Sequence, residues 1–98
     1  MDHDGPARAV IWVHGHVQGV GFRWWVRARA LELGLVGHAR NAGDGRVEVV
    51  AQGEQEQVRQ LVALLEEKPS QHLRPGQVQT CVTSFGAPRD GMDGFVEK

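Results

Sequence analysis

The sequence is short of several residue types and features, and each shortage excludes a class of protein. It has one cysteine, Cys81, which rules out an internal disulfide and suits a reducing compartment. Its 11 basic and 12 acidic side chains leave a formal net charge of −1, which argues against the uniformly basic surface of a nucleic-acid-binding protein. No apolar run approaches membrane-spanning length, and residues 1–4 do not resemble a signal peptide. We therefore expect a soluble cytoplasmic monomer that binds neither membrane nor nucleic acid.

What the sequence does contain is an ordinary globular composition with many glycines. Its 98 residues are enough for one domain, and 41% of them are hydrophobic while 23% are charged. The 13 glycines gather in residues 15–21, 34–45 and 86–94, which indicates glycine-rich loops. Residues 1–6 are polar, so we expect a flexible tail followed by a single domain over residues 7–98.

The first half of the chain predicts a strand, a loop, a helix and a second strand. Residues 8–14 are rich in β-branched and aromatic side chains, which is typical of a strand, and residues 15–21 make a glycine-rich connection. From residue 22 to 33, apolar side chains recur at helical spacing, and Gly34 supplies a left-handed cap. Residues 35–41 form a weaker strand by composition.

The second half predicts a matching set of elements. Residues 42–45 make a turn into an alternating strand over residues 46–52, and residues 54–68 form the clearest helix. Residues 77–85 predict a further strand, and residues 94–98 a short terminal one. This order predicts an α/β (α+β) protein, a ferredoxin-like βαββαβ sandwich. We expect an antiparallel sheet with both helices on one face, plus the short C-terminal strand.

The stretch that points to chemistry lies between the first predicted strand and the first predicted helix. It reads His14-Gly15-His16-Val17-Gln18-Gly19-Val20-Gly21-Phe22-Arg23. Its glycines permit positive φ and close approach of backbone amides to a ligand, and a helix N-terminus adds N–H donors with partial positive charge. Arg23 can add a two-pronged guanidinium, so the loop suits phosphate. Glycine spacing alone favours an ordinary turn with a solvated Arg23, and the loop is neither a nucleotide P-loop nor a dinucleotide-binding fingerprint.

The literal string favours the phosphate interpretation. Residues 17–23, Val-Gln-Gly-Val-Gly-Phe-Arg, resemble the acylphosphatase signature letter for letter. A second block also resembles this family: Gly34-Leu35, Gly37, Arg40-Asn41, Asp44-Gly45, Val47-Glu48 and Gly53. The resemblance extends over nearly the whole chain beyond the tail. It implies an acylphosphatase, a hydrolase that splits small acyl phosphates such as carbamoyl or acetyl phosphate.

The family resemblance implies which residues act. Arg23 takes the role of the catalytic, phosphate-binding arginine, and Asn41 that of the residue that positions water. Phosphate binding falls to Gly15, His16, Val17, Gln18, Gly19, Val20, Gly21, Phe22 and Arg23. The family uses no metal, no cofactor and no covalent intermediate. The sequence departs from the family at His16, His38, Ala39 and Ala42, and Ala42 offers no hydroxyl to support the Asn41 amide.

These few functional groups are sufficient for the reaction. The leaving group is a carboxylate, whose acid has a pKa of roughly 4 to 5, so no protein acid is needed. The site must hold the phosphoryl group, stabilise its charge and place water in line. Inorganic phosphate, the product, should therefore also inhibit.

Other functions stay open at this point. A ferredoxin-like module without catalysis could sense phosphate or serve a larger assembly, as in hydrogenase maturation proteins. Single-stranded RNA binding rests on fold analogy alone.

Other candidate residues favour structural roles. His14 and His16 lack a third metal ligand at useful spacing, so we expect exposed histidines and no metal site. Cys81 is expected as a buried thiol, Asp44 as a turn residue and the three tryptophans as packing residues.

Overall fold

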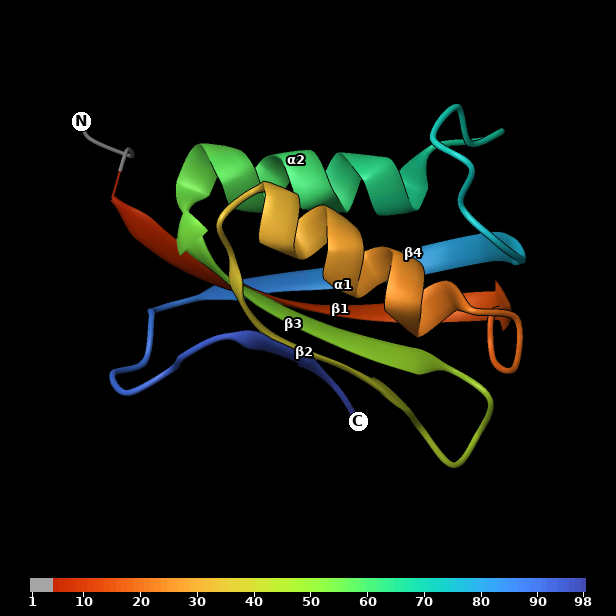
Figure 1. The fold of residues 1–98 in the computed structure, drawn as a ribbon, viewed down its shortest axis with the longest axis horizontal. Helices are drawn as coiled ribbons and strands as arrows, with labels where there is room; N and C mark the ends of the chain where they lie inside the picture. The colour runs from red at the N-terminus through yellow and green to blue at the C-terminus, as the bar shows by residue number, and fades with distance from the viewer. Residues whose placement is uncertain (1–4) are drawn as a thin grey trace.

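The structure, a computed structural model, describes residues 5–98 (Figure 1). Residues 1–4 of the predicted tail lie outside this part of the chain. The elements run β1 (Pro6–His16), α1 (Phe22–Glu32), β2 (Val36–Asn41), β3 (Val47–Glu54), α2 (Gln55–Glu66), β4 (Gln77–Gly86) and β5 (Phe95–Glu97). This confirms the predicted βαββαβ order with its additional short strand. None of the helices over the described residues is long and apolar enough to cross a bilayer.

The strands form one sheet in the order β4-β1-β3-β2-β5. The pairs β4–β1, β1–β3 and β3–β2 are antiparallel, as predicted, but β5 pairs with β2 in parallel, so the sheet is mixed. The predicted antiparallel sheet is thus confirmed for these four strands, and the short terminal strand, whose direction was not predicted, adds a parallel edge. The chain leaves β4 at one edge, turns back and reaches the opposite edge, where its reversed direction coincides with that of β2.

Several element ends lie one or two residues from the predicted positions, and two of these shifts have a clear cause. β1 begins at Pro6, a residue assigned to the tail, because Pro6 is already paired with Glu54 of β3. α2 ends at Glu66, two residues before the predicted end, since Glu67 adopts an extended conformation with ψ 130°. The predicted cap of α1 is confirmed: Gly34 has φ 73°, and the next amide donates a 2.9 Å hydrogen bond to the carbonyl of Ala30.

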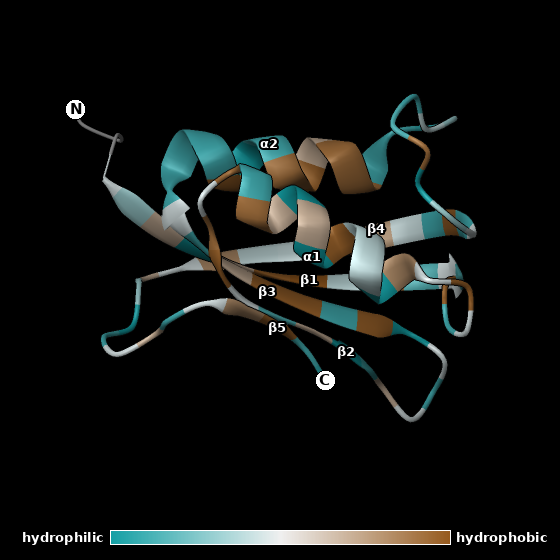
Figure 2. Cartoon of the chain, viewed as in Figure 1, coloured by the Kyte–Doolittle hydropathy of each residue, from teal (hydrophilic) through white to brown (hydrophobic). Residues whose placement is uncertain are grey.

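Both helices cover the same face of the sheet, as predicted (Figure 1). From β1 and β3, Ile11, Val13 and Val49 point into this layer and are fully buried. From the helices come fully or almost fully buried apolar side chains: Phe22, Val26, Ala30, Val58, Leu61 and Leu65. Figure 2 shows the corresponding apolar segments along β1 and β3 beneath the helices. This core holds the end of β1 and the start of α1 in fixed positions.

The other face of the sheet carries no helix (Figure 1). Trp12 lies on it, since its neighbours Ile11 and Val13 point into the core. The guanidinium carbon of Arg46 lies 4.2 Å from the Trp12 ring centroid, and that of Arg40 lies 5.8 Å away. Trp12 is thus a packing residue for two arginines, in agreement with the expectation that the tryptophans pack.

Candidate active site

The end of β1 sets the position of the glycine-rich loop. The pairing of β1 with β4 shifts register between His14 and Gly15, an irregularity two residues before the strand ends at His16. Gly15 has φ 142°, and a Cβ there would lie 2.1 Å from the carbonyl oxygen of Gln77. Only glycine therefore fits at this point, near the end of β1 and just before the loop.

The loop that follows has the backbone predicted for it. Gly19 and Gly21 have φ 76° and 85°, in the left-handed region that favours glycine. No atom lies within 4 Å of a Cβ built on either residue. The preference for glycine at both positions therefore comes from the backbone conformation and not from crowding by neighbouring atoms. Val17 and Phe22 are each 1% exposed and anchor the two ends of the loop in the core.

The N-terminus of α1 is left open to a ligand. Its N-cap, Gly21, has no side chain to bond the first amides, and the first turn carries no acidic residue. The first helical bond runs from the amide of Trp25 to the carbonyl of Gly21 at 3.1 Å, so the amides before Trp25 have no partner within the helix. These donors and the helix dipole make the position suitable for an anion.

Arg23 lies in the first turn of α1, with its side chain 29% exposed. One guanidinium nitrogen, Nη1, donates a hydrogen bond to the backbone carbonyl of Lys98. The other, Nη2, lies 3.9 Å from Oε1 of Glu97. Lys98, directly after β5, therefore holds the arginine beside the loop, a relationship that the sequence did not predict.

Gln18 connects the loop to the turn between β2 and β3. Its side-chain nitrogen Nε2 donates hydrogen bonds of 2.9 Å to the carbonyls of both Ala42 and Arg46. The same turn is closed by a 2.8 Å bond from the amide of Ala42 to the carbonyl of Arg46. Figure 1 shows the loop and this turn at the same end of the sheet. Sequence reasoning placed Gln18 among the phosphate-binding residues but missed this bridging role of its side chain.

Asn41 is the last residue of β2 and pairs with Val47 of β3. Alternation along the strand places its side chain on the helix-covered side of the sheet, with Ala39 and buried Val47. Asn41 is exposed, and its carboxamide makes no hydrogen bond to any residue in the described range 5–98. Both ends of the amide are therefore free to bind water next to the turn that Gln18 holds.

The residues near Asn41 that depart from the family pattern point to different faces of the sheet. Ala39 is fully buried in the core. His38 points to the opposite face, where its Nε2 lies 3.0 Å from Oε1 of Glu48, and Arg40 donates to the same oxygen at 2.7 Å. Burial raises the pKa of the Glu48 carboxyl, but the hydrogen bonds from His38 and Arg40 outweigh it and keep the pKa below its usual value. His38 is thus part of an ion-pair cluster on the far side from Asn41.

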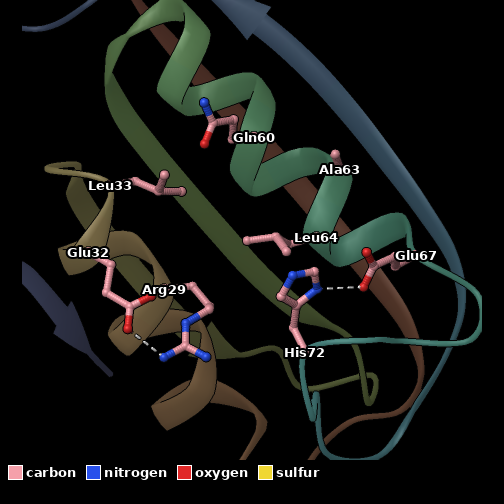
Figure 3. Close-up of a pocket in the computed structure, with 8 residues that line it drawn as sticks. All are labelled: Arg29, Glu32, Leu33, Gln60, Ala63, Leu64, Glu67 and His72. Carbon is pink, nitrogen blue, oxygen red and sulfur yellow. Dashed lines mark hydrogen bonds and ion pairs between the residues drawn. The ribbon is translucent and has the colours of Figure 1, made fainter.

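Two cavities flank these elements. A polar cavity of about 320 Å³ lies between the loop and the β2–β3 turn, and its lining includes His14, His16 and Arg46. A larger one of about 400 Å³ lies between α1, α2 and the segment after α2, away from the glycine-rich loop (Figure 3). Over residues 5–98, no group of three His, Cys, Asp or Glu side chains is arranged to hold a metal ion.

Fold and site together define the class of protein: a ferredoxin-like α/β domain with an anion-binding loop between its first strand and first helix. The family model described as acylphosphatase matches residues 9–97. An acylphosphatase of Corynebacterium efficiens is 54% identical over 91 residues, which cover 93% of this chain and 91% of that protein. The chain belongs to the acylphosphatase family.

Solved structures agree on the fold. The crystal structure of acylphosphatase from Bacillus subtilis superposes with a TM-score of 0.82 at 27% identity, covering 94% of this chain and 98% of that one. Full-length HypF, in a phosphate- and nucleotide-bound form, matches with a TM-score of 0.80 at 21% identity. That match covers 99% of this chain but only 12% of HypF, and it shows a shared fold alone.

Proposed function

We propose that this protein hydrolyses small acyl phosphates to a carboxylate and inorganic phosphate by direct in-line attack of water. The observation that carries the proposal is the left-handed Gly19 and Gly21 leading into an uncapped helix N-terminus, with Arg23 in the first turn. Membership of the acylphosphatase family supports it.

Phosphate binding is assigned to the loop amides of residues 15–22 and to Arg23. The amides and the helix N-terminus offer fixed donors to the phosphoryl oxygens, and these donors need no reorganisation as charge shifts during the reaction. Arg23 keeps donors on Nη2, because the 3.9 Å separation from Glu97 is too long for a hydrogen bond. A planar guanidinium can contact two phosphoryl oxygens at once.

Positioning of the attacking water is assigned to Asn41. Its carboxamide oxygen accepts a hydrogen bond from water while its NH₂ group donates elsewhere. An asparagine cannot act as a base, so the proton of the water passes to a phosphate oxygen of the substrate. The carboxylate departs without a protein acid, since its conjugate acid has a pKa of roughly 4 to 5. The reaction so described uses no metal and no cofactor.

The substrate and setting follow from the same chemistry. The recognised part is the phosphate, so small acyl phosphates such as acetyl or carbamoyl phosphate suit the site, and inorganic phosphate inhibits as product. We propose a monomer made of one domain, which begins with β1 at Pro6, one residue before the predicted boundary at residue 7. Cys81 lies in β4 without a disulfide partner, which suits the cytoplasm.

A phosphate-binding module without catalysis is the competing function. The test compares hydrolysis of benzoyl phosphate with that of p-nitrophenyl phosphate, whose phenolate is a poorer leaving group. We expect rapid turnover of the acyl phosphate, little of the aryl phosphate, and loss of the first activity in Arg23→Ala. Tight phosphate binding with no turnover of benzoyl phosphate would establish the module instead.

A further inference from the structure

The neighbourhood of Arg23 includes a carboxylate that the proposed reaction does not use. Glu97 lies in β5, where it pairs in parallel with Ala39, and its side chain is 17% exposed. Ala39 is fully buried beneath the helices, so Glu97 lies on the sheet face towards α1. Its Oε1 lies 3.9 Å from Nη2 of Arg23.

The carboxylate of Glu97 is poorly satisfied. Its second oxygen, Oε2, is buried and has no hydrogen-bond partner among residues 5–98. The 3.9 Å approach to Arg23 is an ion pair without a hydrogen bond. A buried carboxylate oxygen without a donor is unfavourable, and such an arrangement calls for a functional explanation.

Arg23 does not depend on Glu97 for its placement. Its Nη1 is already held by the carbonyl of Lys98. β5 itself is fastened by a 2.8 Å bond from the amide of Lys98 to the carbonyl of Ala39 and by a 3.0 Å bond from Nε of Arg27 to the carbonyl of Phe95. Loss of the Glu97 charge therefore leaves both the strand and the arginine in place.

We propose that the Glu97 carboxylate weakens the ground-state binding of phosphate ligands at Arg23, of dianions more than of monoanions, and so raises both KM and the phosphate inhibition constant. The inference rests on the proposed function of the loop and Arg23. An anion that contacts Nη2 comes within a few ångströms of the Glu97 carboxylate, and like charges repel in proportion to the ligand charge. The repulsion acts on bound substrate and on bound product alike.

This role predicts a particular kinetic pattern. Glu97 changes ground-state binding, so its neutral variant should lower KM and the phosphate inhibition constant together while kcat stays near the wild-type value. If Glu97 only kept the Arg23 side chain in position, its substitution would have the opposite effect: phosphate would bind more weakly and kcat would fall.

The experiment measures binding of sulfate, a dianion, and methyl sulfate, a monoanion, by calorimetry. In Glu97→Gln we expect sulfate to bind roughly three- to tenfold more tightly than in the wild type. Methyl sulfate should gain about the square root of that factor, since its charge is half as large. Glu97→Asp keeps the charge and should stay near wild type. Glu97→Thr, a residue well suited to strands, is a second neutral variant if Glu97→Gln does not fold.

A matched control removes a negative charge from the other end of α1. Glu32 lies at the far end of α1 from Arg23, about 13 Å along the helix axis. Its side chain is 64% exposed. Glu32→Gln should bind sulfate as the wild type does. An equal gain in Glu32→Gln and Glu97→Gln would overturn the inference, because it would reflect net charge alone.

The outcomes separate the inference from the function on which it rests. If the wild type binds sulfate through Arg23, as loss in Arg23→Ala would show, but a folded neutral Glu97 variant binds it equally or less tightly, the inference is wrong and the proposed function stands. If the wild type binds neither sulfate nor phosphate, the proposed function fails and the inference fails with it.

Discussion

The side-chain amide of Gln18 donates a 2.9 Å hydrogen bond to the carbonyl of Ala42, the residue directly after Asn41. Through this bond the loop assigned to phosphate and the residue assigned to water are held by one side chain. The backbone carbonyl and not the side chain of Ala42 makes this connection, so it does not require a hydroxyl at position 42.

Replacing Gln18 tests whether this bridge matters for catalysis. In Gln18→Leu the turn keeps its own backbone bonds but loses both hydrogen bonds from the loop, so Asn41 should be less well placed and kcat for benzoyl phosphate should fall about tenfold or more. Gln60→Leu is the matched control, since Gln60 is exposed on α2 and its side chain donates to Gln57, and it should keep wild-type kcat. Wild-type kcat in a folded Gln18→Leu would show that the bridge has no catalytic role.

The left-handed glycines give a second prediction. Gly19→Val or Gly21→Val forces a β-branched residue to φ near 76° or 85°, which moves the loop amides off the anion. Inhibition by inorganic phosphate should weaken in both variants while circular dichroism stays native. Gly43→Val is the control, since Gly43 has no positive φ and no atom crowds a Cβ there. Retention of wild-type phosphate inhibition at both positions would refute the loop assignment.

The Glu48 cluster predicts how stability depends on pH. The pKa of Glu48 is held below its usual value near 4.5, so the unfolded state binds more protons than the folded state in this range. The stabilisation is present above about pH 5 and is lost as pH falls through the folded pKa. Glu48→Gln should remove about 0.5–1 kcal/mol at pH 7 and less at pH 3. Thermal unfolding at both pH values measures the loss of stability, with Glu56→Gln, at an exposed position of α2, as control. An equal loss of stability in Glu48→Gln at both pH values would contradict the prediction.

The proposed reaction needs no metal ion. Turnover of benzoyl phosphate should therefore be unchanged after extended dialysis against EDTA, because the loop amides and Arg23 supply the positive field around the phosphoryl group. Activity that disappears on dialysis and returns with Mg²⁺ or Zn²⁺ would contradict the account.

Features encoded by neighbouring residues were predictable from the sequence. The start of α1, its left-handed cap at Gly34 and the positive φ of Gly19 and Gly21 each depend on a few consecutive residues, and each is confirmed. Features that join distant segments were not predictable. The bond from Arg23 to Lys98 and the parallel pairing of β5 with β2 depend on where the chain returns to the sheet edge, which no local pattern encodes.

The tryptophans of α1 illustrate the same limit. Trp24 and Trp25 are adjacent, yet Trp24 is 63% exposed and Trp25 only 9%. Apolar spacing predicted a stripe of Phe22, Val26, Ala30 and Leu33, of which the first three are buried, but left both tryptophans beside it. The segment after α2 decides between them, because the indole nitrogen of Trp25 donates a 2.8 Å hydrogen bond to the carbonyl of His72.

The most direct test of the account is kcat for benzoyl phosphate in Asn41→Ala, measured together with phosphate inhibition. Asn41 is assigned to the attacking water alone, so its contribution arises in the transition state and not in phosphate binding. In a variant with native circular dichroism we expect kcat to fall about 100-fold or more. The phosphate inhibition constant should stay within about twofold of wild type. A folded Asn41→Ala that turns over at the wild-type rate would contradict the assignment of the water to Asn41.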